Sequence, residues 1–238
     1  MRKLERFWNR KSYLQIKNVV KKSEHIVITI DGPSASGKST NARLVAKKLG
    51  YIYVDTGAMY RTLAWYCLKK GVDVDDPKAV AALCRKWKPT LELVDNAAYL
   101  LVDGYFPKSE IRTSEVSAAV AHVAAIPKVR EWMKKTQQST SQFGNLVMEG
   151  RDTGTNIFPE TDFKFYLDAC IHERSKRREA EGVQENLAAR DAKDSQRATS
   201  PLMIPLGAKI INNSGQTPAE TSSLIIEEVT KRLADRKR

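Results

Sequence analysis

Apolar residues along the chain fall into two patterns, short continuous runs and longer stretches with helical spacing. His25–Ile30 is a β-branched run of the kind found in strands that are buried on both faces. Similar runs recur at 145–149, Phe163–Leu167 and Ala208–Ile211, and a shorter one is Tyr53–Val54. Because helical patterns separate these runs, the sequence predicts an α/β fold built on a parallel sheet.

Capping residues mark the ends of several predicted helices. Gly50 stands where the first helix should end, Pro127 precedes another helix, and Thr217–Glu220 is a capping box with proline at its first helical position. From these signals and the apolar spacing we expect helices at 42–49, 57–70, 76–87, 113–124, 128–138 and 217 to about 233.

One segment departs from this alternation of strands and helices. Apolar and polar residues alternate in Thr90–Val94 and again in Tyr99–Val102, on either side of Asp95–Asn96. Alternation around such a turn pair is typical of two antiparallel strands. The sequence therefore predicts a small antiparallel piece inserted between the helices.

The loop after the first strand carries a phosphate-binding motif. Gly32, Gly37, Lys38 and Ser39 fit G-x-x-x-x-G-K-[ST], with a strand before them and a helix after them as the motif requires. Glycines let the backbone N–H groups and the helix N-terminus converge on an anion, while the lysine reaches the β- and γ-phosphates and the serine oxygen serves Mg²⁺. We predict a nucleoside triphosphate site formed by Gly32, Pro33, Ser34, Ala35, Ser36, Gly37, Lys38, Ser39 and Thr40.

Composition narrows the class of protein. The chain has 238 residues, 42% hydrophobic and 29% charged, which is typical of a soluble globular protein of one large or two small domains. No run of 18 apolar residues predicts a membrane span. The three cysteines are scattered, which disfavours a disulfide framework or a zinc site and favours a reducing, cytoplasmic location.

The net charge of +12 is concentrated at the two ends of the chain. Residues 1–24 hold eight basic and two acidic side chains, and residues 231–238 hold five basic and one acidic, which leaves the body at +2. We therefore separate a basic extension, 1–24, from a domain at 25–238. The extension either touches a membrane or polyanion or is a solvated tail. A basic nucleic-acid-binding ATPase is a further alternative, but without an aromatic-basic motif we expect no specific nucleic-acid partner.

Arginines beside small polar residues follow the phosphate-binding loop in four clusters. They lie in 53–61, 109–116, 146–155 and 190–197, and two of the clusters follow buried strands. Ligands of open α/β sheets bind at the carboxyl ends of strands, and arginine suits bidentate binding of phosphate. Taken singly, an arginine in these clusters could equally be a surface charge or one member of an ion-pair ladder along a helix.

Five segments together resemble bacterial-type cytidylate kinases, from about residue 26 to 230. They read D-G-P-x-x-x-G-K, D-x-G-x-x-Y-R, E-I-R-T-x-E-V, G-R-D-x-G-T and R-D-x-x-D-x-x-R. The resemblance implies the P-loop nucleoside monophosphate kinase fold, a parallel five-stranded core with helices on both faces. It also implies a monophosphate-binding insert at about 88–112 and a short mobile lid at about 172–198. The implied reaction is Mg²⁺-assisted transfer of the γ-phosphoryl group of ATP to CMP and dCMP, by a monomer.

The resemblance also assigns roles to residues. Arg61 and Arg151 would hold the acceptor phosphate, and Arg112 and Asp152 would read the cytosine. Contacts to the ribose and the rest of the acceptor nucleotide would come from Arg190, Asp194 and Arg197, with Thr56 and Glu149 completing that site. Arg174 and Arg178 would be the lid arginines that act on the triphosphate beside Lys38. Ser39 would serve Mg²⁺, which is otherwise held by nucleotide and water.

Several residues depart from the family's pattern. Thr56 stands where serine is common, Glu149 replaces a frequent aspartate, and Asn213 replaces an aspartate after the last strand. The phosphate-binding loop itself reads Ser-Ala-Ser-Gly-Lys-Ser. The alternative within the same class is a P-loop kinase that acts on AMP, UMP or a non-nucleotide acceptor.

Overall fold

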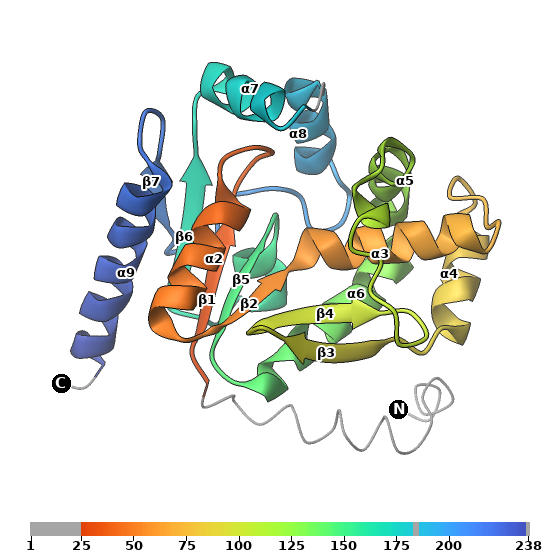
Figure 1. Cartoon of the computed structure of the whole chain (residues 1–238), viewed down its shortest axis with the longest axis horizontal. Coiled ribbons are helices and arrows are strands. Elements are labelled where there is room, and N and C mark those ends of the chain that lie inside the picture. The colour runs from red at the N-terminus through yellow and green to blue at the C-terminus, as the bar shows by residue number, and fades with distance from the viewer. Residues whose placement is uncertain (1–24, 183–185, 237–238) are drawn as a thin grey trace.

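The computed structural model describes residues 25–182 and 186–236, so the predicted extension at 1–24 lies outside it. Parallel strands and helices alternate along the chain, as predicted. The seven strands of the described part form one sheet in the order β3-β4-β2-β5-β1-β6-β7 (Figure 1). In chain order they are β1 (Val27–Asp31), β2 (Ile52–Asp55), β3 (Thr90–Val94), β4 (Ala97–Leu101), β5 (Leu146–Gly150), β6 (Phe163–Asp168) and β7 (Lys209–Asn212).

The predicted five-stranded core is too small. The hairpin β3–β4 is antiparallel within itself, as predicted, but β4 also pairs in parallel with β2 through Tyr53–Ala97 and Val54–Ala98. Asp95 and Asn96 both have positive φ angles, 50° and 57°, which is the conformation of a tight hairpin turn. Because β4 is mostly buried whereas β3 is mostly exposed, the hairpin gains burial by extending the sheet instead of standing apart.

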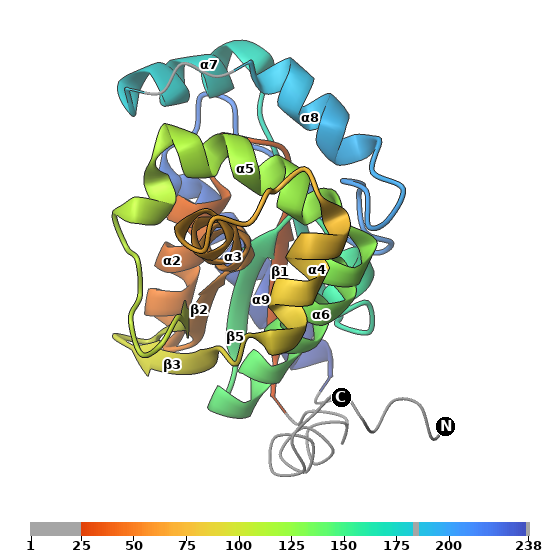
Figure 2. The ribbon, with the colours of Figure 1, turned by 90° about the vertical axis from the view of Figure 1, so that its right-hand side faces the viewer.

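Helices cover both faces of the sheet, and the alternation of side chains along each strand divides the core in two. Val27 points to the cluster formed with α3, α4, α5 and α6, whereas Ile28 and Ile30 point to the cluster formed with α2 and α9. Figures 1 and 2 show the two layers from directions at right angles. The helices are α2 (Lys38–Leu49), α3 (Thr56–Lys69), α4 (Pro77–Lys86), α5 (Ser114–Ala125), α6 (Pro127–Gln138), α7 (Ile171–Ala180), α8 (Leu187–Ser195) and α9 (Pro218–Asp235).

The predicted helix ends agree with the structure to within a residue or two, except that the first helix begins earlier, at Lys38. Thr113 accepts a hydrogen bond from the N–H of Val116, and the capping box of Thr217 and Glu220 is complete. The three cysteines are free, as the composition predicts. Within 25–182 and 186–236, we find no helix that is both long and apolar enough to cross a bilayer.

The carboxyl ends of the central parallel strands meet at one edge of the sheet. Asp31 pairs with Gly150 across β1 and β5, and Asp55 pairs with Glu149 across β2 and β5. The loops that follow these strands therefore begin side by side. Helices α7 and α8 lie above the same edge in Figure 1.

Candidate active site

The phosphate-binding loop leaves β1 at the middle of the sheet and enters α2 directly. At Gly32 a Cβ atom would lie 2.1 Å from the carbonyl oxygen of Leu167, so only glycine lets the loop pass so close to β6. Gly37 has a φ angle of 85° and is the N-cap of α2, which begins at Lys38. The left-handed turn at Gly37 directs the first N–H groups of the helix toward the loop, as an anion site requires.

Lys38 is buried inside this loop. Its Nζ donates to the carbonyl oxygen of Pro33 at 2.5 Å and to Oγ of Ser36 at 3.2 Å. Burial lowers the pKa of Lys38 well below its usual value, and the positive charge of Arg151 lowers it further. A phosphate bound in the loop would supply a negatively charged partner for this ammonium group, whose hydrogen bonds to Pro33 and Ser36 go to neutral oxygens.

Hard oxygen donors lie beside Lys38. Glu149, at the end of β5, accepts hydrogen bonds from the Tyr53 hydroxyl at 3.0 Å and from the side chain of Ser39. Burial raises the pKa of the Glu149 carboxyl, and so does the nearby charge of Asp55. A buried carboxylate that needs a cation, next to a hydroxyl at the start of α2, fits Mg²⁺ when phosphates and waters complete its shell.

Asp31 is the first residue whose structural role sequence reasoning missed. Its carboxylate is fully buried and accepts hydrogen bonds from the N–H of Thr153 at 2.9 Å, the hydroxyl of Thr153 at 2.8 Å and the N–H of Gly154 at 2.7 Å. Burial raises the pKa of Asp31 to about 6. The three hydrogen bonds to Asp31 fix the π-helical turn η5 (Thr153–Ile157) to the start of the phosphate-binding loop. This turn follows the G-R-D segment.

Arg151 and two acidic or basic residues of the predicted 190–197 cluster, Asp194 and Arg197, form one ion-pair group. The Nε of Arg151 donates to Asp194 at 2.8 Å, and Arg197 pairs with the other oxygen of the same carboxylate. Although burial alone would raise the pKa of Asp194, these two arginines lower it. The spacing of Arg190, Asp194 and Arg197 predicts that all three lie on one face of a helix, and this is wrong for Arg197: α8 ends at Ser195, so Arg197 lies beyond the helix and reaches Asp194 from the following turn.

Arg61 lies on α3 and faces the segment before α5. Its guanidinium donates to the carbonyl oxygen of Ile111 at 3.3 Å and to Oγ of Ser117 at 2.8 Å. Burial lowers its pKa to about 10, together with repulsion from Arg190 and Arg112. The site therefore brings these predicted arginines close enough to repel one another.

Two other predicted residues have partners within the protein. Arg112, in the turn η3 (Glu110–Arg112), is about half exposed and forms an ion pair with Asp55 at 3.2 Å. Thr56 is buried, and its hydroxyl donates to the backbone carbonyl of Glu149 at 2.8 Å. The Thr56 hydroxyl thus connects α3 to β5, and its proton is used in that hydrogen bond.

Asp152, which the resemblance assigns to the cytosine, forms a buried ion pair within the protein. Its Oδ2 lies 2.7 Å from Nη2 of Arg130, a buried arginine on α6 that also lies over the ring of Tyr60. The Nε of Arg130 is buried without a hydrogen-bond partner among the described residues. Sequence reasoning missed Arg130; the available signal is an arginine that continues the apolar stripe of Val129 and Met133 on α6.

The predicted lid is folded onto the phosphate-binding loop. Arg174 of α7 donates to the carbonyl oxygen of Ser34 at 3.0 Å and pairs with Asp191 of α8 at 2.5 Å. Asp191 in turn accepts from the N–H of Ser34 at 3.0 Å. Arg178 lies 3.5 Å from Oγ of Ser34 and pairs with Glu181 at 2.6 Å. Both predicted lid arginines therefore reach the loop.

A third lid arginine, Arg177, was not singled out from the sequence. It donates to the carbonyl oxygen of Ala35 at 3.3 Å and to Oδ1 of Asn213 at 3.2 Å. The amide of Asn213 donates to the carbonyl oxygen of Ser36 at 2.9 Å. Since an aspartate could not donate that hydrogen bond, asparagine at 213 suits a loop contact that needs both a donor and an acceptor.

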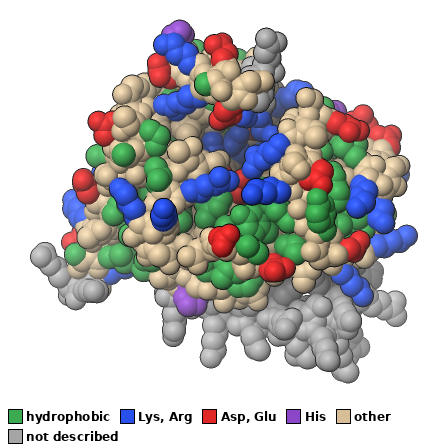
Figure 3. All heavy atoms as spheres, viewed as in Figure 1, with side chains coloured by type: hydrophobic (Ala, Val, Ile, Leu, Met, Phe, Trp, Pro, Cys, Tyr) green, Lys and Arg blue, Asp and Glu red, His purple; other side chains and the backbone are tan. Residues whose placement is uncertain are grey.

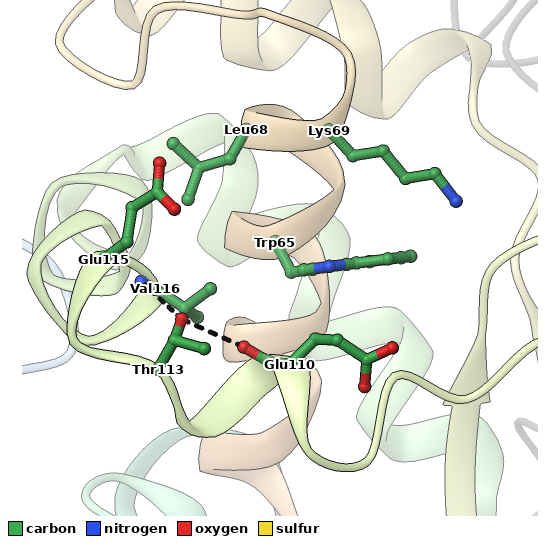
Figure 4. A pocket seen from close by; sticks show the side chains of 7 residues that line it. All are labelled: Trp65, Leu68, Lys69, Glu110, Thr113, Glu115 and Val116. Atoms are coloured by element: carbon green, nitrogen blue, oxygen red, sulfur yellow. Dashed lines mark hydrogen bonds between the residues drawn. The ribbon is translucent and has the colours of Figure 1, made fainter.

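Positive charge gathers at the carboxyl edge of the sheet. Lysine and arginine side chains surround a hollow below α7 and α8 in Figure 3. A separate cavity of about 350 Å³ lies between α3 and the η3–α5 segment (Figure 4). The second cavity holds a single lysine, Lys69, against Glu110 and Glu115, so it lacks the charge for a polyphosphate. The hollow at the sheet edge is the candidate nucleotide site.

Comparisons with known proteins agree with this geometry. The cytidylate kinase family model matches residues 28–232. The cytidylate kinase of Geobacillus thermodenitrificans is 38% identical over 219 residues, 87% of this chain and 98% of that protein. The cytidylate kinase of Bacillus velezensis is 39% identical over 216 residues, 86% of this chain and 96% of that protein.

The chain also matches longer proteins. A bifunctional pantoate ligase/cytidylate kinase of Trichormus variabilis is 37% identical over 235 residues, which make up 92% of this chain. The chain spans 44% of the length of that relative, somewhat less than half.

Proposed function

The chain belongs to the cytidylate kinase family, and from this premise we propose that it transfers the γ-phosphoryl group of ATP to CMP and dCMP. An oxygen of the acceptor phosphate forms a bond to the γ-phosphorus, and the bond from that phosphorus to the β–γ bridging oxygen breaks. The products are ADP and CDP or dCDP. The observation that carries the proposal is the pairing of Asp31 with Gly150, since it places the loop of Lys38 beside the loop of Arg151.

The reaction needs positive charge and alignment more than it needs a base. The second pKa of a phosphate monoester is near 6, so the attacking oxygen is already anionic at neutral pH. Lys38 and the lid arginines Arg174 and Arg178 would hold the triphosphate, while Arg61 and Arg151 would hold the acceptor phosphate. Burial lowers the pKa values of Lys38 and Arg61, and repulsion from neighbouring arginines lowers them further; bound phosphates would relieve that repulsion.

Mg²⁺, when bound, would neutralise charge on the phosphates between which the group moves. Ser39 and Glu149 would hold it, because they supply the hydroxyl and carboxylate oxygens next to the loop. The Tyr53 hydroxyl orients Glu149 in that position.

The base of the acceptor would be read by Arg112 and Asp152, as the resemblance implies, and Arg130 would join them as the buried partner of Asp152. Asp152 uses Oδ2 for Arg130, and no described residue donates a hydrogen bond to Oδ1. Arg130 also holds an unpaired N–H at Nε. One acceptor and one donor in a buried pair suit the amino group and ring acceptors of cytosine. Arg190, Asp194 and Arg197 would complete the acceptor site beside the sugar, and Thr56 would support it through Glu149.

We also infer the moving parts and the setting. Residues 88–112 would act as the monophosphate-binding insert, and residues 172–198 would act as the lid that excludes water during transfer. The enzyme would work as a monomer in the cytoplasm, which suits three free cysteines. Size-exclusion chromatography with light scattering tests the monomer.

A monophosphate panel tests the function. ADP release is measured by a coupled assay with ATP and each of CMP, dCMP, UMP and AMP. CMP and dCMP should lead, whereas UMP or AMP leading would replace this function with that of another nucleotide kinase. Lys38→Ala should abolish turnover with every acceptor while the circular dichroism spectrum stays unchanged. Lys47→Ala, at an exposed lysine in the last turn of the same helix, is the control.

A further inference from the structure

One face of α6 is bound to the π-helical turn η5 by three polar side chains. Arg130, Lys134 and Gln138 are spaced four residues apart, so they lie in a row along the helix. Lys134 donates from Nζ to Oδ1 of Asn156 at 3.1 Å, and Gln138 donates from Nε2 to the carbonyl oxygen of Ile157 at 2.8 Å. Arg130 pairs with Asp152, the residue that precedes the turn. The turn is thus fixed to α6 at its last two residues and at the residue that precedes it.

Lys134 decides which way the amide of Asn156 points. An ammonium group can only donate, so the amide oxygen of Asn156 must face Lys134. The amide nitrogen is therefore turned to the other side, where Nδ2 donates to Oδ2 of Asp152 at 3.1 Å. The backbone of the turn keeps the two side chains together, since the N–H of Asn156 donates to the carbonyl oxygen of Asp152 at 2.9 Å.

Two donors, Arg130 and Asn156, reach the same oxygen of Asp152. A carboxylate held by one donor can rotate about its last side-chain bond, whereas two donors on Oδ2 fix its plane. Oδ1 is then left at a constant position as a hydrogen-bond acceptor. That arrangement is what a reader of an exocyclic amino group needs, because a 4-oxo group on the base would meet the carboxylate as a second acceptor.

We propose that Asn156 and Lys134 are positioning residues that set the preference for a 4-amino over a 4-oxo pyrimidine nucleotide by holding Asp152. The proposal rests on the base-reading role proposed above for Asp152. Lys134 acts through Asn156, and Asn156 acts through Asp152. Neither residue needs to touch the nucleotide.

We call the series of contacts from Lys134 through Asn156 to Asp152 the relay. Lys134→Glu tests the relay because it should reverse the orientation of the Asn156 amide. A glutamate accepts from Nδ2 of Asn156, so the amide oxygen would turn toward Asp152 and repel it. The ratio of kcat/KM for CMP to that for UMP should fall about tenfold, the effect of one hydrogen bond to a charged group. Lys134→Arg keeps a donor and should keep the ratio. Lys135→Glu makes the same change of charge one residue away, at a side chain that pairs with Glu131, and should also keep the ratio.

Asn156→Leu provides an independent removal of the donor, and the ratio should again fall. Urea midpoints of both variants are measured to confirm that they fold. A merely structural role would lower kcat/KM for CMP and UMP alike, and an unchanged ratio in both variants would overturn the relay.

Asp152→Asn separates this proposal from the one on which it rests. If Asp152→Asn leaves the CMP to UMP ratio unchanged, the base-reading role of Asp152 is wrong and the relay falls with it. If Asp152→Asn lowers the ratio while Asn156→Leu and Lys134→Glu do not, the relay is wrong and the role of Asp152 stands. A fall in all three supports the relay.

Discussion

Asp31 is a carboxylic acid in a place where its charge is costly. It is fully buried at the end of β1, and its three hydrogen bonds to Thr153 and Gly154 only partly offset the lost hydration. Burial raises the pKa of the folded protein's Asp31 from 3.8 to about 6. The folded protein is therefore more stable when Asp31, the acid that fixes η5 to the phosphate-binding loop, is protonated.

This shift predicts a pH dependence of stability. The folded-state pKa lies above the unfolded one, so the stability that Asp31 contributes is present at low pH and is lost as the pH rises through about 6. Between pH 5 and 7.5, the difference in free energy of unfolding between wild type and Asp31→Asn should shrink by about 1.4 kcal/mol. Urea denaturation across that range measures it, and a constant difference would contradict the shift.

The same residue scale shows what a sequence can and cannot reveal about a site. Lys38 and Ser39 could be predicted because their spacing is tied to the chemistry of one loop. Arg130 and Asp152 come from segments more than 20 residues apart, and their pairing depends on how α6 packs against η5. In the sequence the only local sign that sets Arg130 apart from Lys128 is its place in the apolar stripe of α6, and that sign does not name Asp152 as its partner.

Among the elements, α9 is joined to the edge strand β7 by a small ion-pair network. Glu228 accepts from Lys209 at 2.8 Å and from Arg232 at 2.7 Å. The hydrogen bonds from Lys209 and Arg232 lower the pKa of Glu228 to about 2. For an acid whose folded pKa is depressed, the contribution to stability is present above pH 4.5 and is lost as the pH falls toward 2.

Glu228→Gln should therefore lower the free energy of unfolding by about 0.5–1 kcal/mol at pH 7, the size of a surface ion pair. The loss should be smaller at pH 3, because the carboxyl of the unfolded wild type is then mostly protonated and ionisation of Glu228 in the folded protein contributes less to stability. Urea midpoints at the two pH values measure both effects. Glu227→Gln, at the exposed neighbour, is the control, and an equal loss in that variant would argue against the network.

Elements were predictable where their signals are local. Caps such as Gly50 and Thr217 fixed helix ends in advance, because the hydrogen bonds they satisfy lie within one turn. The pairing of the strands in the sheet was harder to predict. Nothing in Ala97–Leu101 specifies β2 as its partner, since the pairing of a strand from the outer hairpin depends on which apolar surface is left uncovered after the rest has folded.

At the scale of the whole molecule, net charge says little about the site. Of the net charge of +12, +10 lies in residues 1–24 and 231–238, whereas the arginines of the site belong to a body whose net charge is only +2. The family match begins at residue 28. The charge of the two ends is therefore separate from the charge of the candidate nucleotide site.

Removing residues 1–22 should weaken binding to anionic surfaces and leave the kinetics with CMP almost unchanged. We expect kcat and KM for CMP to stay within about twofold, and salt-dependent retention on an anionic resin to fall because eight basic side chains are lost. Steady-state kinetics and elution at graded salt measure the two. Binding to anionic vesicles and to RNA, with and without the segment, distinguishes a membrane or nucleic-acid contact from a solvated tail. A tenfold loss of kcat/KM would place the segment in the catalytic machinery.

The register of β1 against β5 also sets the distance between two loops of the site. The loops that carry Lys38 and Arg151 start from neighbouring strands, and neighbouring strands are about 4.8 Å apart in any sheet. The spacing of the two loops thus comes from backbone hydrogen bonding and not from the loops themselves. For the proposed transfer, changes in loop length or in the outer hairpin would alter which nucleotide is accepted without altering the distance between the loops that would hold donor and acceptor phosphates.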